Sequence, residues 1–225
     1  MKFRKPELIP LLFIICATLV LCTLGAWQVK RLQWKNALIA DIAAAQSLET
    51  LGNLPQDVTG LTYRNVILTG RYMNDKTLRL VGRKENMRAG FFVLTPFVLE
   101  DDGRVILVNR GYAEEGNEHP VDGVQSVKGV LRPPREKRPF APENQQDKNL
   151  WFYEDIHAIS VITGSPLIPY VIEATGDDRT TQPIVSDGKI SMRNDHLGYA
   201  ITWFSLALVG LVMFAFYQRI PENKA

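Results

Sequence analysis

Two uncharged apolar runs decide the fold: residues 8–27, LIPLLFIICATLVLCTLGAW, and residues 197–217, LGYAITWFSLALVGLVMFAFY. Of these 41 residues, 33 are apolar and none is Asp, Glu, Lys or Arg. A helix of about 20 apolar residues crosses the hydrocarbon core of a bilayer, which is about 30 Å thick. We therefore expect two transmembrane helices, although the hydrophobic content of 46% and the net charge of +2 over 225 residues are ordinary for a soluble domain.

This pattern excludes several functional classes. Two spans hold the rest of the chain at a membrane, which excludes a freely diffusing cytosolic enzyme or nucleic-acid binder, and they are too few for a many-helix transporter. The uncharged spans also argue against ion conduction. Between them, 21 Lys and Arg residues are balanced by 22 Asp and Glu residues, so the region has no basic surplus for a nucleic-acid partner.

The flanking charges predict the topology. The first run is longer than the apolar part of a secretory signal, and no small-x-small cleavage site follows it, so we expect an uncleaved anchor. Short basic tails, residues 1–7 and 218–225, favour the cytoplasmic side. Residues 28–196 then form a domain in the periplasm or an equivalent intermembrane space, held by spans 8–27 and 197–217.

The first helix is expected to continue beyond the membrane. Trp27, Arg31, Trp34 and Leu38 recur at i, i+4, i+7 and i+11, which is a helical spacing. This pattern predicts a helix that ends at about Gln46.

The region between the spans has the pattern of an α+β domain. Short runs rich in β-branched and aromatic residues predict strands at 62–72, 77–83, 90–99, 104–112, 125–131 and 166–173. Asp101, Asp102 and Gly103 predict a hairpin turn between two antiparallel strands. A proline-rich surface loop is expected over 133–149, a short helix within 151–163 and a turn-rich segment over 175–189. We expect an antiparallel β-sheet with a few helices, flanked by the two transmembrane helices.

The sequence lacks the patterns of an enzyme. It contains no nucleophile elbow, P-loop or zinc-protease motif, and its histidines, His119, His157 and His196, are far apart. Cys16 and Cys22 lie inside the first apolar run, so the domain has neither a disulfide nor a thiol metal site. We expect a protein that is not an enzyme, with no metal-binding cluster of side chains in this domain.

His196 stands out by its position at the outer end of the second span. Tyr199 and Trp203 follow at i+3 and i+7, on the same helical face. A neutral imidazole here can ligate a heme iron, with Asp195 or Asn194 as an orienting partner. The alternative is a polar boundary residue at the level of the lipid headgroups.

The first span offers a complementary set of residues. Small residues on both spans allow the helices to approach closely, which would bring His196 near Trp27, Gln28 and Arg31. A guanidinium can pair with a carboxylate such as a heme propionate, or it can contact a lipid phosphate. Trp27 also fits an interfacial aromatic belt.

Several segments together resemble the surfeit locus protein 1 family. They are GAWQVKR at 25–31, GFFVLTPF at 90–97, VNRGY at 108–112, NLWF at 149–152, PY at 169–170 and DHLGYAITWF at 195–204. These segments occur in the family's order and cover nearly the whole chain. The sequence departs mildly from the family at Tyr112, where members usually have Trp.

The resemblance implies an assembly factor for heme–copper (aa3-type) cytochrome c oxidase. It implies that heme a is bound as cargo, that His196 is the candidate axial ligand, and that subunit I, heme A synthase and membrane lipid are the partners. Arg31 would contact a propionate, while Trp27, Gln28, Tyr199 and Trp203 complete the site. The alternative is a scaffold that stabilises unassembled subunit I without binding heme.

Three further residues lie within the resembling segments. Asn109, Arg110 and Trp151 fit turn and core positions, and the sequence assigns them no functional role.

Overall fold

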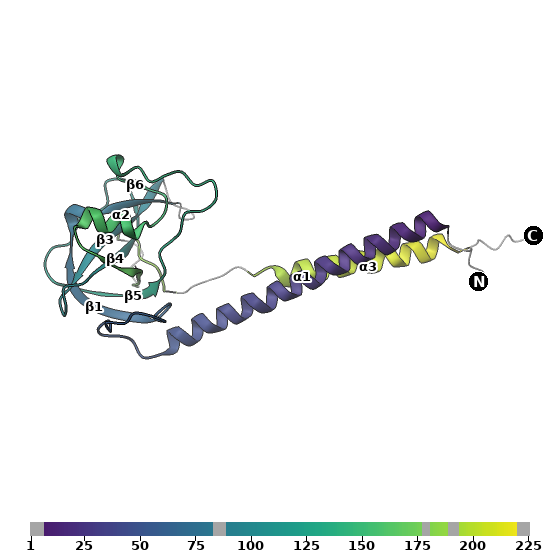
Figure 1. Cartoon of the computed structure of the whole chain (residues 1–225), viewed down its shortest axis with the longest axis horizontal. Coiled ribbons are helices and arrows are strands. Elements are labelled where there is room, and N and C mark those ends of the chain that lie inside the picture. The colour runs from purple at the N-terminus through teal and green to yellow at the C-terminus, as the bar shows by residue number, and fades with distance from the viewer. Residues whose placement is uncertain (1–6, 83–88, 177–180, 189–193, 220–225) are drawn as a thin grey trace, which may run out of the picture. The chain divides into compact units, whose positions relative to one another are not determined.

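The computed structural model describes residues 7–82, 89–176, 181–188 and 194–219 (Figure 1). The chain divides into two compact units, which we describe separately. Met1–Asp41 and Ser191–Ala225 belong to the first unit, and Ile42–Ile190 form the second.

The first unit consists of two long helices. Helix α1 (Leu8–Ser47) and helix α3 (His196–Tyr217) are both long and apolar enough to cross a membrane, as the sequence predicted. They lie side by side (Figure 1). Helix α1 continues well past the apolar run, which confirms the prediction that it ends near Gln46, and its residues from Ile42 onward belong to the second unit.

Small residues let α1 and α3 pack closely. A Cβ atom on Gly25 would lie only 2.7 Å from the Phe204 ring, so the aromatic side chain occupies the space that glycine leaves open. Ala200 and Ala207, seven residues apart on α3, are both buried. This spacing keeps them on one face of the helix, and the predicted close approach of the two helices is therefore confirmed.

The second unit is a seven-stranded sheet with one α-helix. Its elements are β1 (Asn65–Tyr72), η1 (Asn74–Lys76), β2 (Leu78–Gly82), β3 (Gly90–Leu99), β4 (Val105–Glu114), β5 (Gln125–Arg132), η2 (Gln146–Lys148), β6 (Leu150–Trp151), α2 (Ile156–Thr163) and β7 (Leu167–Ala174). The strand order is β1-β5-β7-β4-β3-β2-β6, and β1 also pairs with β3. The additional pairing closes five of the strands into a small barrel, while β2 and β6 extend the sheet beyond it.

The expectation of an antiparallel sheet was wrong for two of the pairings. Strand β7 runs parallel to β4, and β6 runs parallel to β2. Parallel neighbours need a long connection along the chain. The chain between β4 and β7 carries β5, β6 and α2, and the chain between β2 and β6 carries β3, β4 and β5. The short helix expected within 151–163 is α2, which begins after Asp155, and Trp151 before it ends the two-residue strand β6 with its side chain in the core.

Strand β4 is buried on both faces and separates two hydrophobic clusters. Ile106 and Val108 belong to the cluster inside the barrel, whereas Val105 and Leu107 pack with Trp151 in the second cluster. Alternating residues of a strand point to opposite faces, which explains the division. The predicted short strand thus becomes the central wall of the domain.

Local sequence signals define the turns. The hairpin predicted at Asp101–Gly103 joins β3 to β4, with Gly103 in the left-handed region at a φ of 71°. Helix α2 begins after Asp155, whose side chain accepts a hydrogen bond of 3.0 Å from the backbone N–H of Ala158.

Gly70 is expected to be essential where β1 crosses β3. A Cβ atom on Gly70 would lie 2.1 Å from the Val98 carbonyl oxygen, and a backbone atom cannot move away cheaply. Gly70→Ala should therefore lower the free energy of unfolding by about 2 kcal/mol. Gly52→Ala is the matched control, because a Cβ there meets no atom within 4 Å. Urea unfolding followed by circular dichroism tests this, and equal midpoints for both variants would contradict it.

Candidate functional site

The candidate site lies where the first residue of α3 meets α1. His196 is the first residue of α3, and its Nδ1 atom lies 2.7 Å from the amide oxygen of Gln28 on α1. Gln28 is only 9% exposed, although a buried amide is costly unless it is hydrogen-bonded. The structure thus brings together two of the residues that the sequence singled out.

The orientation of the Gln28 amide defines the histidine tautomer. Its oxygen can only accept a hydrogen bond, so the ring donates from Nδ1–H. The lone pair of His196 is then on Nε2, which is the nitrogen free to ligate a metal. A hydrogen-bonded second nitrogen is the usual arrangement of a metal-binding histidine.

The hydrogen-bond partner of the His196 Nδ1 atom, Gln28, was not expected in that role from the sequence. We expected Asp195 or Asn194 to orient His196, and the structure shows Gln28 at its Nδ1 atom. Asn194 instead donates a hydrogen bond of 2.8 Å to the side chain of Asn36 on α1. Only the helix-to-helix register could reveal these two contacts, because each joins residues more than 150 positions apart.

The other predicted site residues have contacts and exposures of their own. The Arg31 guanidinium lies 4.0 Å from the centroid of the Trp34 ring, a cation–π contact within α1. Trp27 and Tyr199 are each 55% exposed, whereas Trp203 is half-buried. Arg31 therefore already has an aromatic contact, while the two exposed aromatic side chains can contact lipid or a bound ligand.

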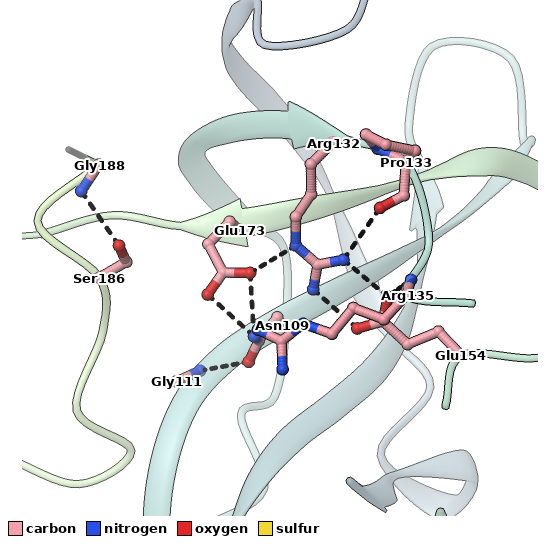
Figure 2. Close-up of polar contacts among 9 residues, drawn as sticks. All are labelled: Asn109, Gly111, Arg132, Pro133, Arg135, Glu154, Glu173, Ser186 and Gly188. Atoms are coloured by element: carbon pink, nitrogen blue, oxygen red, sulfur yellow. Dashed lines mark hydrogen bonds and ion pairs between the residues drawn. The ribbon is translucent and has the colours of Figure 1, made fainter. Parts of the chain in front are cut away.

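A second polar cluster was not predicted from the sequence (Figure 2). It lies in the second unit, Ile42–Ile190, which we call the β-rich unit. Arg132 at the end of β5 bonds Glu154 through Nη1 at 2.6 Å and Nη2 at 2.7 Å, and its Nε bonds Glu173 of β7 at 2.8 Å. Burial disfavours the charged guanidinium, but the hydrogen bonds and charges of Glu154 and Glu173 outweigh it and raise the pKa of Arg132. The cluster ties β5, β7 and the segment before α2 together.

Two residues of the resembling segments, Asn109 and Trp151, make contacts inside the domain. Asn109 donates to both carboxylate oxygens of Glu173, at 2.9 and 3.0 Å, and accepts a hydrogen bond from the N–H of Gly111 (Figure 2). Trp151 is 1% exposed and donates to the Asn149 side chain. These contacts orient the central strand and fill the core.

Known proteins similar to this chain point to one family. The model of the SURF1 family matches residues 15–208. The chain is 33% identical to a SURF1-like protein of Monosiga brevicollis, over 90% of this chain and 85% of that protein. It is 32% identical to Surfeit locus protein 1 of Rattus norvegicus, over 88% and 72%, and 31% identical to a SURF1-like protein of Rickettsia conorii, over 89% and 87%.

Proposed function

Because this chain belongs to the SURF1 family, known as cytochrome c oxidase assembly factors, we propose that it binds heme a and assists its insertion into subunit I of a heme–copper oxidase. In this role the protein is a carrier, not an enzyme. Heme a is its cargo, and subunit I and heme A synthase are its partners on either side of the transfer.

The His196–Gln28 hydrogen bond is the observation that carries the proposal. It leaves Nε2 of His196 free to bind iron and holds the imidazole ring in one orientation. Buried polar groups between membrane helices are costly and therefore mark functional positions. A pair of this kind at the end of two apolar helices fits a cargo that has an iron centre and a long apolar tail.

The remaining site residues fit the other parts of the cargo. We assign the propionate contact to Arg31, which is exposed and would have to add this partner to its contact with Trp34. Trp27, Tyr199 and Trp203 would pack against the macrocycle or its tail. Their exposure in the structure leaves aromatic surface available for that purpose.

The proposal includes a location. The two apolar helices fit a membrane protein, and the basic tails favour a cytoplasmic position for both termini. The β-rich unit would then lie in the periplasm of a bacterium, with the His196 site at the outer surface of the inner membrane.

Expression with and without heme A synthase tests the function. The purified full-length protein should carry close to one heme a per chain when the synthase is present, measured by pyridine hemochrome spectra and protein mass. It should also co-purify with subunit I. Retention of subunit I without stoichiometric heme would contradict the carrier function and support a scaffold that stabilises the unassembled subunit.

Gln28 should tune heme affinity without being a ligand. Gln28→Leu removes the acceptor that orients the imidazole, and loss of such a partner typically costs about 10–100-fold in metal affinity. Gln28→Glu keeps an acceptor at the same place and should retain more affinity. Titration of the apo-proteins with heme, followed at the Soret band, compares them; equal affinity of Gln28→Leu and the unchanged protein would contradict the assigned role.

A further inference from the structure

Arg110 of β4 lies buried at one end of the barrel. Arg110 lies on the same face of β4 as Ile106 and Val108, whose side chains belong to the barrel core. It lies closer to the end of the strand than they do. The side chain is only 7% exposed. It lines a groove of about 450 Å³ together with residues of β1, β5 and the segment that follows β7.

The charge of Arg110 has no carboxylate partner within the part of the chain that the structure describes. One guanidinium nitrogen donates to the carbonyl oxygen of His119 at 2.6 Å, and the guanidinium carbon lies 5.1 Å from the centroid of the Tyr72 ring. Arg132, by contrast, pairs with both Glu154 and Glu173. A buried cation without a counterion is destabilising, so such a residue calls for an explanation.

Burial shifts the pKa of both Arg110 and Tyr72. Burial lowers the pKa of Arg110, and the neighbouring Tyr72 acts in the opposite direction. Burial raises the pKa of Tyr72 to about 12, although the charge of Arg110 lowers it. The phenol therefore stays protonated at neutral pH, so the groove is lined by a cation and a neutral hydroxyl.

We propose that this groove binds the carboxylate of an apolar acid, with Arg110 as the anion-binding residue. A guanidinium has five N–H donors in a planar fork that matches a carboxylate, and one of them reaches His119. Val127 and Val185 contribute apolar wall, which suits a ligand with an uncharged body. Lys128 also lines the groove, but its side chain is exposed. At the buried end of the groove the positive charge is therefore that of Arg110, which matches the single negative charge of a carboxylate.

This site is independent of the heme proposal. All of its residues belong to the β-rich unit, and the test uses no heme, so either proposal can fail without the other.

Ligand-observed NMR with the full-length protein in lipid nanodiscs tests the proposal. The probe is 3-phenylpropionate, and 3-phenylpropanamide is its uncharged counterpart. We expect the carboxylate to bind at least about tenfold more tightly than the amide, because a charge-assisted pair is lost with the amide. We expect Arg110→Met to remove this preference; equal binding of the two probes, or an unchanged preference in Arg110→Met, would overturn the proposal.

Arg104→Met is the matched control for loss of a cation. Arg104 also belongs to the β-rich unit and donates to the backbone carbonyls of Leu54 and Pro55, but it does not line the Arg110 groove. This variant should keep the preference for the carboxylate. Arg110→Lys retains the charge without the fork, and we expect it to bind the carboxylate several-fold more weakly than the unchanged protein.

Thermal stability distinguishes binding from a purely structural role. If Arg110 serves a ligand, Arg110→Met removes an uncompensated buried charge, so the melting temperature of the ligand-free protein should stay the same or rise. A large fall would show that a partner inside the protein satisfies Arg110, which would overturn the proposal.

Two further probes identify the source of the carboxylate. A short peptide with a free C-terminal Phe, compared with its C-terminal amide, tests for a peptide ligand; binding of 3-phenylpropionate alone indicates a free small acid. Benzylphosphonate tests for a doubly charged anion, and tighter binding of this probe than of 3-phenylpropionate would overturn the assignment to a carboxylate.

Discussion

His196→Ala is expected to reduce bound heme a to the background level, whereas His157→Ala should leave it unchanged. The imidazole of His196 has its Nδ1 hydrogen-bonded to Gln28, so Nε2 is the free ligand atom, and alanine supplies no replacement. His157 lies exposed on α2 in the other unit and is the matched histidine control. The readouts are the heme content and absorption spectrum of full-length protein co-expressed with heme A synthase.

Circular dichroism separates loss of the heme ligand from loss of the fold. Helical content by circular dichroism should be the same for His196→Ala and the unchanged protein, because His196 is the first residue of α3, so the change removes its contact with Gln28 and leaves the later turns of the helix packed. Added imidazole should restore part of the original heme spectrum if the cavity left by the side chain admits it. An unchanged heme content and spectrum in His196→Ala would contradict the ligand assignment.

Glu154→Ala is expected to destabilise the β-rich unit by about 3–5 kcal/mol. The Glu154 side chain is fully buried and accepts hydrogen bonds from two nitrogens of Arg132 and from the backbone N–H of Arg135 (Figure 2). Removing it leaves Arg132 buried with only Glu173 as a charged partner, and an under-compensated buried charge is costly. Urea unfolding of the full-length protein in mild detergent measures the change.

Two variants control for this result. Glu143→Gln removes one member of the surface pair between Lys137 and Glu143, and it should leave the unfolding midpoint nearly unchanged. The double variant Arg132→Met/Glu154→Ala removes both charges, so it should cost less than the two single changes added together. Strict additivity of the single effects would contradict the coupled network.

Much of the architecture was predictable because it depends on local patterns. The apolar runs at residues 8–27 and 197–217 are long enough to predict the first half of α1 and nearly all of α3 by length alone. Strand β3 begins and ends where predicted, and its turn to β4 follows from the Asp-Asp-Gly triplet. In each case the residues that predict the element are neighbours in the sequence.

The errors concern pairings between distant residues. The parallel position of β7 beside β4 depends on a long crossover, and β6 is a strand only because Arg79 and Leu80 of β2 offer it a ladder. Two residues have too little local signal to predict a strand. The Arg132–Glu154–Glu173 cluster was missed for the same reason, since its members come from three separate segments.

The sequence by itself determined the two apolar helices and the α+β class of the domain, and it singled out His196 as a candidate site residue, because periodicity, length and position are properties of short stretches. Only the tertiary structure decided that Gln28 orients His196, that β1 meets β3 to close the barrel and that Arg110 is buried. Each of these depends on the register between elements far apart in the chain. That register is set by the packing of whole faces, such as Gly25 against Phe204, and no local pattern encodes it.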